Sequence, residues 1–179
     1  MPETLRRSPS RTDAATLSGG FGRRALARVG AAAPSLDVVR SVAADLDISP
    51  ERAWVLYSHP QAWPAWAPHL RGGSGLTGYR GEVRAGARGL VWLMGVMPLP
   101  VRVTWVDRGH SWSWKVGPVE MDHVVEEREG GGCRVAVVFR GRGVVEQLCL
   151  ALYGGPAHLF LRNMGRVGRM TPPDAPAAG

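Results

Sequence analysis

Cysteine is scarce in this chain, which has only Cys133 and Cys149 among its 179 residues. Two cysteines without a spacing pattern do not make a disulfide framework or a zinc site, so each is expected to be a small core residue. No metal-ligand cluster, phosphate-binding loop or serine-nucleophile motif occurs either, and we expect no cofactor and no metal. Because no secretion signal is recognised, a reducing cytoplasm is the expected location.

Long apolar runs are also absent. No segment approaches the roughly 18 apolar residues of a membrane-spanning helix, although 45% of the residues are hydrophobic, as is usual in globular proteins. Arg6 and Arg7 are followed by a polar segment, residues 9–20, where an export signal requires an apolar stretch. These absences favour a soluble globular domain.

Basic charge is unevenly distributed along the chain. The formal net charge is +7, and residues 1–36 contribute +4 of it, from six arginines minus two acids. Residues 1–35 have no apolar periodicity, so they are expected to be a disordered basic tail, with a second disordered tail at residues 171–179. The domain is expected to span residues 36–170. Because much of the basic excess belongs to the tail, nucleic-acid binding by the folded body is not predicted.

The longest segment with helical apolar spacing is residues 144–168. Its apolar side chains, Leu152 and Phe160 among them, fall near one face at 3.6 residues per turn. A stripe of this width requires a partner surface. The Gly-Gly-Pro sequence at residues 154–156 predicts a bend or a break in the helix, since proline removes a backbone hydrogen bond.

Short strands dominate the preceding part of the chain. Seven are predicted, at residues 36–47, 69–77, 88–96, 100–107, 110–116, 119–128 and 133–140. Their short connections favour antiparallel hairpins. Two short helices are predicted after the first strand. One begins at Pro50 with Ser49 as its N-cap and stops before Pro60, and the next is a turn that carries Trp63 and Trp66.

A sheet curved over the terminal helix can enclose a cavity. Alternation along the strands places large side chains on the concave face, namely Trp105, Trp112, Trp114, Met121 and Phe139. His123 is the one titratable group in the middle of a strand on that face. Trp92 and Met94 are not placed, because the strand at residues 88–96 is apolar on both faces.

This order of elements resembles the helix-grip fold of the START-like, SRPBCC superfamily. The segment ISPERAWVLYSHPQAWPAWAP, residues 48–68, is similar to the opening of its polyketide cyclase/dehydrase branch, in which a Ser-Pro-Glu helix start precedes a Trp-Pro-x-Trp turn. A Gly-rich hairpin before the last strand and Leu-Arg-Asn at residues 161–163 agree with that branch. The resemblance implies an α+β fold with a seven-stranded antiparallel sheet around a long C-terminal helix. It also implies a deep apolar cavity that takes a hydrophobic small molecule, and it leaves turnover open.

His123 is the candidate catalytic residue, because an inward imidazole can act as general acid or base on a bound carbonyl or hydroxyl. The alternative is a buried histidine satisfied by a neighbour or by water. Asp122 points to the other face of the strand. Glu127 shares the face of His123 but lies about 13 Å along it, at about 3.3 Å per residue, so it is expected at the rim.

Eight apolar side chains are candidate ligand contacts: Trp66, Trp105, Trp112, Trp114, Met121, Phe139, Leu152 and Phe160. Their indoles can stack on a planar ligand and donate hydrogen bonds, although an indole-rich core explains the same composition. His59 and His69 flank the Trp-Pro turn and are interpreted as surface residues.

Two functions remain open from the sequence. The domain is either an enzyme of polyketide cyclase/dehydratase type or a non-catalytic carrier or sensor of a lipid, quinone or polyketide-like molecule. Arginines 162, 166 and 169 lie at helical spacing, which suits transient contact with a membrane surface or simply a solvated face. The sequence indicates neither the ligand nor the oligomeric state.

Overall fold

The computed structural model describes residues 38–141 and 144–170. Both predicted tails, residues 1–35 and 171–179, lie outside these ranges, and the side chains of Cys149 and Leu152 lie outside the described part as well. The elements are β1 (Val38–Leu46), α2 (Pro50–Ser58), the 3-10 helix η2 (Pro60–Ala62), α3 (Trp63–Trp66), β2 (Leu70–Ser74), β3 (Arg88–Leu93), β4 (Met97–Asp107), β5 (Ser111–Val116), β6 (Val119–Glu127), β7 (Cys133–Gly141) and α4 (Val144–Met170).

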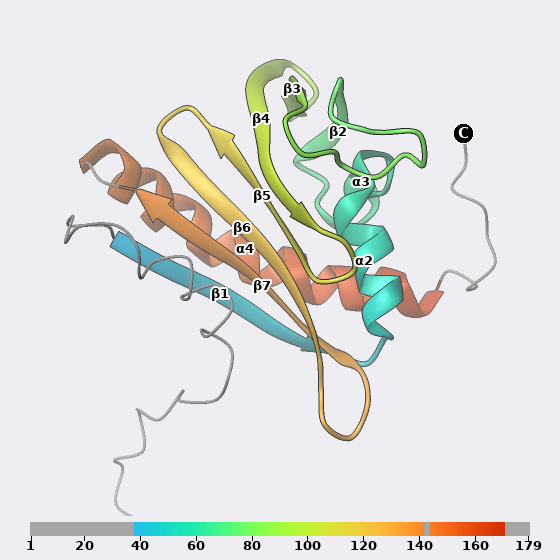
Figure 1. The fold of residues 1–179 in the computed structure, drawn as a ribbon. Coiled ribbons are helices and arrows are strands. Elements are labelled where there is room, and N and C mark those ends of the chain that lie inside the picture. Colours follow the sequence, from blue (N-terminus) through green and yellow to red (C-terminus); the bar gives the residue numbers. More distant parts are fainter. Residues whose placement is uncertain (1–37, 142–143, 171–179) are drawn as a thin grey trace, which may run out of the picture. The chain divides into compact units, whose positions relative to one another are not determined.

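The seven strands form one antiparallel sheet in the order β1-β7-β6-β5-β4-β3-β2. Strands β2 to β7 pair with their neighbours in sequence, as short connections favour, and β1 completes the sheet beside β7. Figure 1 shows the sheet curving, with α4 crossing behind it and α2 and α3 gathered at one end. The predicted helix-grip fold is confirmed.

Helices α2 and α3 are joined through the two indoles of the Trp-Pro turn. The Ser49 side chain caps α2 by accepting a hydrogen bond from the Arg52 N–H at 3.2 Å, as the sequence predicted. At the other end of α2, Trp63 Nε1 donates to the Tyr57 carbonyl at 3.0 Å and Trp66 Nε1 to the Leu56 carbonyl at 2.9 Å. These bonds satisfy carbonyls that the helix end leaves open and orient both buried rings toward the sheet.

Helix α4 is continuous from Val144 to Met170, with Pro156 inside it, so the Gly-Gly-Pro sequence does not break it. Its C-terminal part packs closely on the end of β1. A Cβ on Gly165 would lie 2.8 Å from Leu46 Cδ2, and one on Gly168 would lie 2.7 Å from Ile48 Cδ1. Glycine therefore sets how near the helix comes to the sheet. Asn163 adds a hydrogen bond from Nδ2 to the Trp66 carbonyl at 2.9 Å.

Trp105 does not lie on the predicted face of the sheet, because the register between β4 and β5 shifts before it. Val103 pairs with Trp114, but Trp105 pairs with Ser113 and Val106 with Trp112, so one extra residue lies in β4. A bulge of this kind exchanges the two faces for every residue that follows it. Val106 consequently packs against the core, and Trp105 does not line the cavity described below.

Two strands end earlier than predicted because the chain turns at residues with positive φ. Strand β2 ends at Ser74, before Gly75 with φ of 74°, and β3 ends at Leu93, before Met94 and Gly95 with φ of 55° and 77°. Alternation along β3 then resolves the face that the sequence left open. Val91 is buried, whereas Trp92 is exposed.

Candidate functional site

A cavity of about 500 Å³ lies between the concave face of the sheet and the helices. This volume is within the range of about 300–1,000 Å³ that is typical of small-molecule sites. Helices α2, α3 and α4 and strands β2 to β7 contribute to its wall. The described lining residues are Tyr57, Trp63, Trp66, His69, Leu70, Val91, Leu93, Leu99, Val101, Trp112, Trp114, Val116, Pro118, Val119, Met121, His123, Val137, Phe139, Tyr153, Ala157, Phe160 and Leu161.

The described part of this wall contains no Asp, Glu, Lys or Arg. Its titratable side chains are two tyrosines and two histidines. Burial raises the pKa of Tyr57 and of Tyr153, so both phenols stay protonated. Burial lowers the pKa of His69 and of His123, so both imidazoles are neutral at neutral pH. The described wall therefore carries no net charge.

The inner end of the cavity is a stack of aromatic rings. Trp112 lies parallel to Trp63, with ring centroids 5.9 Å apart, and parallel to His123 at 4.0 Å, each with an interplanar angle of 5°. Trp114 meets all three rings edge-on, at 5.3 to 5.5 Å. Tyr57 contacts the His123 ring edge-on at 5.1 Å and donates its hydroxyl hydrogen to the Ala136 carbonyl at 3.1 Å. These contacts hold His123 in a fixed orientation.

Three polar atoms of this inner end have no hydrogen-bond partner among the described residues. They are Nδ1 of His123 and Nε1 of Trp112 and of Trp114, and all three are buried. Burial lowers the pKa of His123 to about 3, opposed by a hydrogen bond with the backbone of Trp112. An unpaired buried polar atom costs about 1–3 kcal/mol, so each of these atoms would gain from a ligand that supplies a partner.

A second polar pair lies elsewhere in the cavity wall. His69 Nε2 and the Tyr153 hydroxyl are 2.8 Å apart, and the His69 ring stacks on Phe160 with centroids 4.1 Å apart. The His69 carbonyl accepts a hydrogen bond from the Met94 N–H at 2.7 Å. The interpretation of His69 as a surface residue was therefore wrong, because Tyr153 and Phe160 of α4 cover it.

Most of the predicted site residues come together in this cavity. Its lining includes Trp66, Trp112, Trp114, Met121, His123, Phe139 and Phe160. Trp105 is outside the lining because of the bulge in β4, and the Leu152 side chain lies outside the described residues.

The predicted ligand contacts omitted four polar or aromatic members of the wall. Tyr57 and Trp63 belong to segments already predicted as helical, and a helical wheel for α2 would have placed Tyr57 on its inner side. Tyr153 and His69 are 84 residues apart in sequence, and no local pattern indicates their contact.

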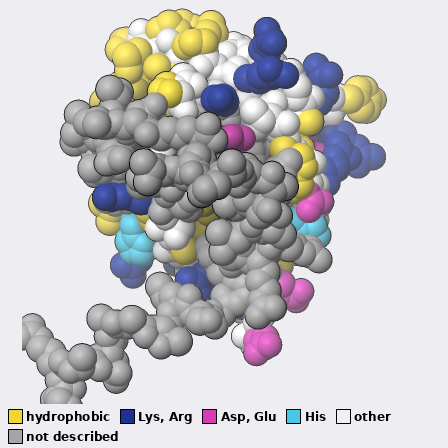
Figure 2. Space-filling view, turned by 60° about the vertical axis from the view of Figure 1, so that its left-hand side comes forward, with side chains coloured by type: hydrophobic (Ala, Val, Ile, Leu, Met, Phe, Trp, Pro, Cys, Tyr) yellow, Lys and Arg dark blue, Asp and Glu magenta, His cyan; other side chains and the backbone are white. Residues whose placement is uncertain are grey.

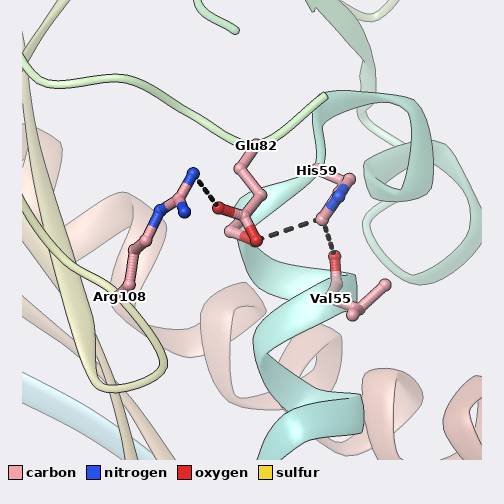
Figure 3. A network of polar contacts seen from close by, with 5 residues as sticks. Val55, His59, Glu82 and Arg108 are labelled. Carbon is pink, nitrogen blue, oxygen red and sulfur yellow. Dashed lines mark hydrogen bonds and ion pairs between the residues drawn. The ribbon is translucent and has the colours of Figure 1, made fainter. Parts of the chain in front are cut away.

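The remaining candidate groups lie outside the cavity. Asp122 forms an ion pair with Arg140 and accepts a hydrogen bond from Ser113 Oγ at 2.6 Å, on the outer face of the sheet. Glu127 is exposed at the end of β6. His59 lies at the end of α2, where Nδ1 is 3.0 Å from the Val55 carbonyl, near the ion pair of Glu82 and Arg108 (Figure 3).

None of the helices in residues 38–141 and 144–170 is long and apolar enough to cross a membrane. In the same ranges no three His, Cys, Asp or Glu side chains are grouped so that they could hold a metal ion.

Solved structures with this fold include proteins of very different sequence. Protein MLL2253 from Mesorhizobium loti matches with a TM-score of 0.61 and 12% identity over 75% of this chain and 100% of its own. Protein NE0264 from Nitrosomonas europaea matches at 0.58 and 10%, over 74% and 94%. Ara h 8.0201 matches at 0.55 and 10%, over 75% and 99%. At these identities the similarity shows the shared fold alone.

Family membership follows from the sequence comparison together with the fold. No curated protein matches the chain. The model of one family, described as polyketide cyclase / dehydrase and lipid transport, matches residues 36–165. These residues include every strand and most of α4, and with them the whole described wall of the cavity. The chain therefore belongs to the polyketide cyclase / dehydrase and lipid transport family.

Proposed function

We propose that the domain binds an uncharged hydrophobic molecule in the cavity and that this molecule carries at least one hydrogen-bond acceptor. The observation that carries the proposal is the inner end of the cavity, where the buried Nε1 atoms of Trp112 and Trp114 have no partner among the described residues, in a wall that is mainly apolar. A carbonyl or ether oxygen would satisfy an indole N–H there. The flat rings beside it suit a planar ligand such as a quinone or an aromatic polyketide.

The charge of the ligand follows from the chemistry of the wall. An ion moved from water into an apolar site costs several kcal/mol unless an opposite charge meets it, and the described lining provides none. Neutral His123 cannot offset a carboxylate unless it takes up a proton, and burial opposes that proton. A fatty acid with its carboxylate inside would therefore bind poorly.

Carrier or sensor function fits His123 better than acid-base catalysis does. A general acid or base works best with a pKa near the working pH, whereas burial lowers the pKa of His123 to about 3. In the described residues the neighbouring carboxylate, Asp122, is paired with Arg140 on the other face of the sheet. His123 is proposed instead as a neutral hydrogen-bonding group.

A cyclase or dehydratase activity is the second candidate, and one observation favours it. The His69 and Tyr153 side chains form an imidazole-hydroxyl pair at 2.8 Å in the cavity wall. Such a pair can deliver a proton to a ligand oxygen and recover it through the imidazole. This candidate predicts product formation that is lost in Tyr153→Phe, whereas a carrier returns its ligand unchanged.

The proposal is tested with two probes that differ only in charge. Binding is followed by quenching of the tryptophan fluorescence. We expect the Kd of neutral 2-acetylnaphthalene to be at least about 100-fold lower than that of 2-naphthoate, its anionic counterpart, because burying the uncompensated charge costs about 3 kcal/mol. Val101→Trp fills the cavity from β4 and should abolish the binding. The matched control, Arg102→Trp, changes the next residue on the exposed face and should bind normally. Equal affinity for both probes, or binding that survives Val101→Trp, would contradict the proposal.

A further inference from the structure

The hairpin between β3 and β4 exposes large apolar side chains at its tip. Relative exposures are 39% for Trp92, 68% for Met94, 81% for Val96 and 47% for Met97. Most exposed apolar residues of a folded protein are scattered, so four within six consecutive residues form a distinct feature. We call residues 92–97 the apolar hairpin.

The turn of the apolar hairpin has an unusual residue at its centre. The Val96 N–H donates to the Leu93 carbonyl at 3.2 Å, and the two residues between them have positive φ, 55° at Met94 and 77° at Gly95. Such turns favour Asn, Asp or Gly at the first position, because a longer side chain is disfavoured there. Methionine at this position costs stability, and its side chain is exposed, so the fold itself gains nothing from it.

The charged side chains of β3, of β4 as far as Val106, and of Arg71 beside the tip are all basic, whereas the acid Glu120 contacts Thr104 further along β4. Residues 83–106 contain three arginines and no acid. At the tip, Arg71 Cγ lies 3.5 Å from the position that a Cβ on Gly95 would take, and Arg88 pairs with Arg102 across the base of the hairpin. Figure 2 shows hydrophobic side chains gathered at the top of the molecule with basic side chains beside them, at the height where Figure 1 draws this hairpin.

The apolar hairpin is continuous with the cavity. Leu93 and Leu99 line the cavity from the two strands of the hairpin, and the Met94 N–H is bonded to the carbonyl of His69, another lining residue. His69 in turn stacks on Phe160 of α4. An apolar surface thus runs from the exposed tip into the proposed binding site.

We propose that the apolar hairpin inserts into the surface of an anionic lipid bilayer. Met94 and Val96 project from a narrow turn. A lipid bilayer can surround such a protruding apolar edge on all sides, whereas a flat protein surface would contact only one side of it. The negatively charged headgroups would attract Arg71 at the tip. Each arginine near such a surface contributes about 1 kcal/mol to the free energy of binding. A second copy of the chain would instead bring like charges together. This inference goes beyond ligand binding and does not depend on which ligand the cavity holds.

Vesicle co-sedimentation tests this inference on the full chain. We expect the wild type to bind vesicles of phosphatidylcholine mixed with phosphatidylglycerol, and to bind phosphatidylcholine alone weakly. Met94→Asn should reduce the binding about tenfold, because an exposed methionine that enters the bilayer contributes much of the apolar transfer free energy. The same change should raise the urea midpoint, because asparagine accepts the positive φ. Reduced binding together with higher stability excludes unfolding as the cause.

A second variant and a matched control sharpen the result. Val96→Asp places a carboxylate at the most exposed of the four apolar side chains and should reduce binding at least as much. Tyr79→Asp changes a fully exposed aromatic residue in another loop and should leave binding within about twofold. Unchanged binding in Met94→Asn and Val96→Asp would overturn the inference. So would a concentration-dependent dimer in sedimentation velocity that Val96→Asp dissolves while vesicle binding is absent.

The two proposals fail in distinguishable ways. If the wild type binds 2-acetylnaphthalene but no vesicles, the bilayer inference is overturned and the cavity proposal stands. If it binds vesicles through the apolar hairpin but never binds the neutral probe, the reverse holds. The hairpin variants should bind the probe normally in the absence of vesicles, since their changed side chains lie outside the cavity lining.

Discussion

The two histidines of the cavity wall differ in burial and in the group that each contacts. His123 is stacked on Trp112, is 7% exposed, and has an Nδ1 atom without a partner among the described residues. His69 is half-buried and contacts Tyr153 through Nε2 at 2.8 Å. Each imidazole has a protein partner, the Trp112 backbone for His123 and the Tyr153 hydroxyl for His69, and in each the buried Nδ1 atom has no partner among the described residues. The difference indicates that burial and hydrogen bonding, rather than residue type, determine what each imidazole can do.

The largest expected difference is in the stability lost when the aromatic ring beside each histidine is removed. Trp112→Ala removes an indole that is 1% exposed between Trp63 and His123, and should lower the free energy of unfolding by about 3–5 kcal/mol. Phe160→Ala, beside His69, removes a half-buried ring and should cost under about 2 kcal/mol. Urea titration of both variants measures the difference. Equal losses would mean that the inner stack has no special role in stability.

The pH dependence of stability should distinguish the inner histidine next. Burial lowers the pKa of His123 to about 3, whereas histidine in an unfolded chain titrates near 6.5. Between these values the unfolded state binds the additional proton, so the free energy of unfolding falls as the pH is lowered. From pH 7.5 to pH 5, the wild type should lose about 2 kcal/mol more than His123→Phe. Parallel losses in urea titrations of the two proteins would refute this assignment.

Replacement of His123 by phenylalanine should separate binding from folding. The change keeps a flat ring against Trp112 and removes both the hydrogen bond with the Trp112 backbone and the Nδ1 atom that has no partner among the described residues, so stability at pH 7.5 should change by no more than about 1 kcal/mol. If the Nδ1 atom of His123 also accepts a hydrogen bond from the ligand, affinity for 2-naphthol, whose hydroxyl can donate, should fall about tenfold, the equivalent of about 1.4 kcal/mol. Unchanged affinity in the fluorescence titration would mean that His123 forms no hydrogen bond with the ligand.

The smallest effect is expected at the outer pair. Tyr153→Phe removes a hydroxyl that contacts His69 and should cost about 1 kcal/mol in a urea titration. Tyr79→Phe is the matched control, because its hydroxyl is fully exposed, and it should change stability negligibly. A Tyr153→Phe variant as stable as the wild type would show that the pair contributes nothing to folding.

Local pattern was sufficient for the part of the cavity wall that β5, β6 and β7 contribute. The alternation in β5, β6 and β7 placed Trp112, Trp114, His123 and Phe139 on the concave face, and the structure brings all four to the cavity. The prediction that Trp105 lies on the concave face was wrong for a physical reason. The bulge in β4 adds one residue, and the alternation of apolar side chains does not indicate where the register between two strands shifts.

By itself the sequence determined the family, the order of elements and the apolar character of the concave face, because periodicity, turns and caps are local properties of the chain. Only the tertiary structure decided that His69 contacts Tyr153, that Nδ1 of His123 has no partner among the described residues and that Met94 projects from the surface. Each of these depends on which distant residues surround a group, and desolvation and hydrogen bonding are properties of those surroundings.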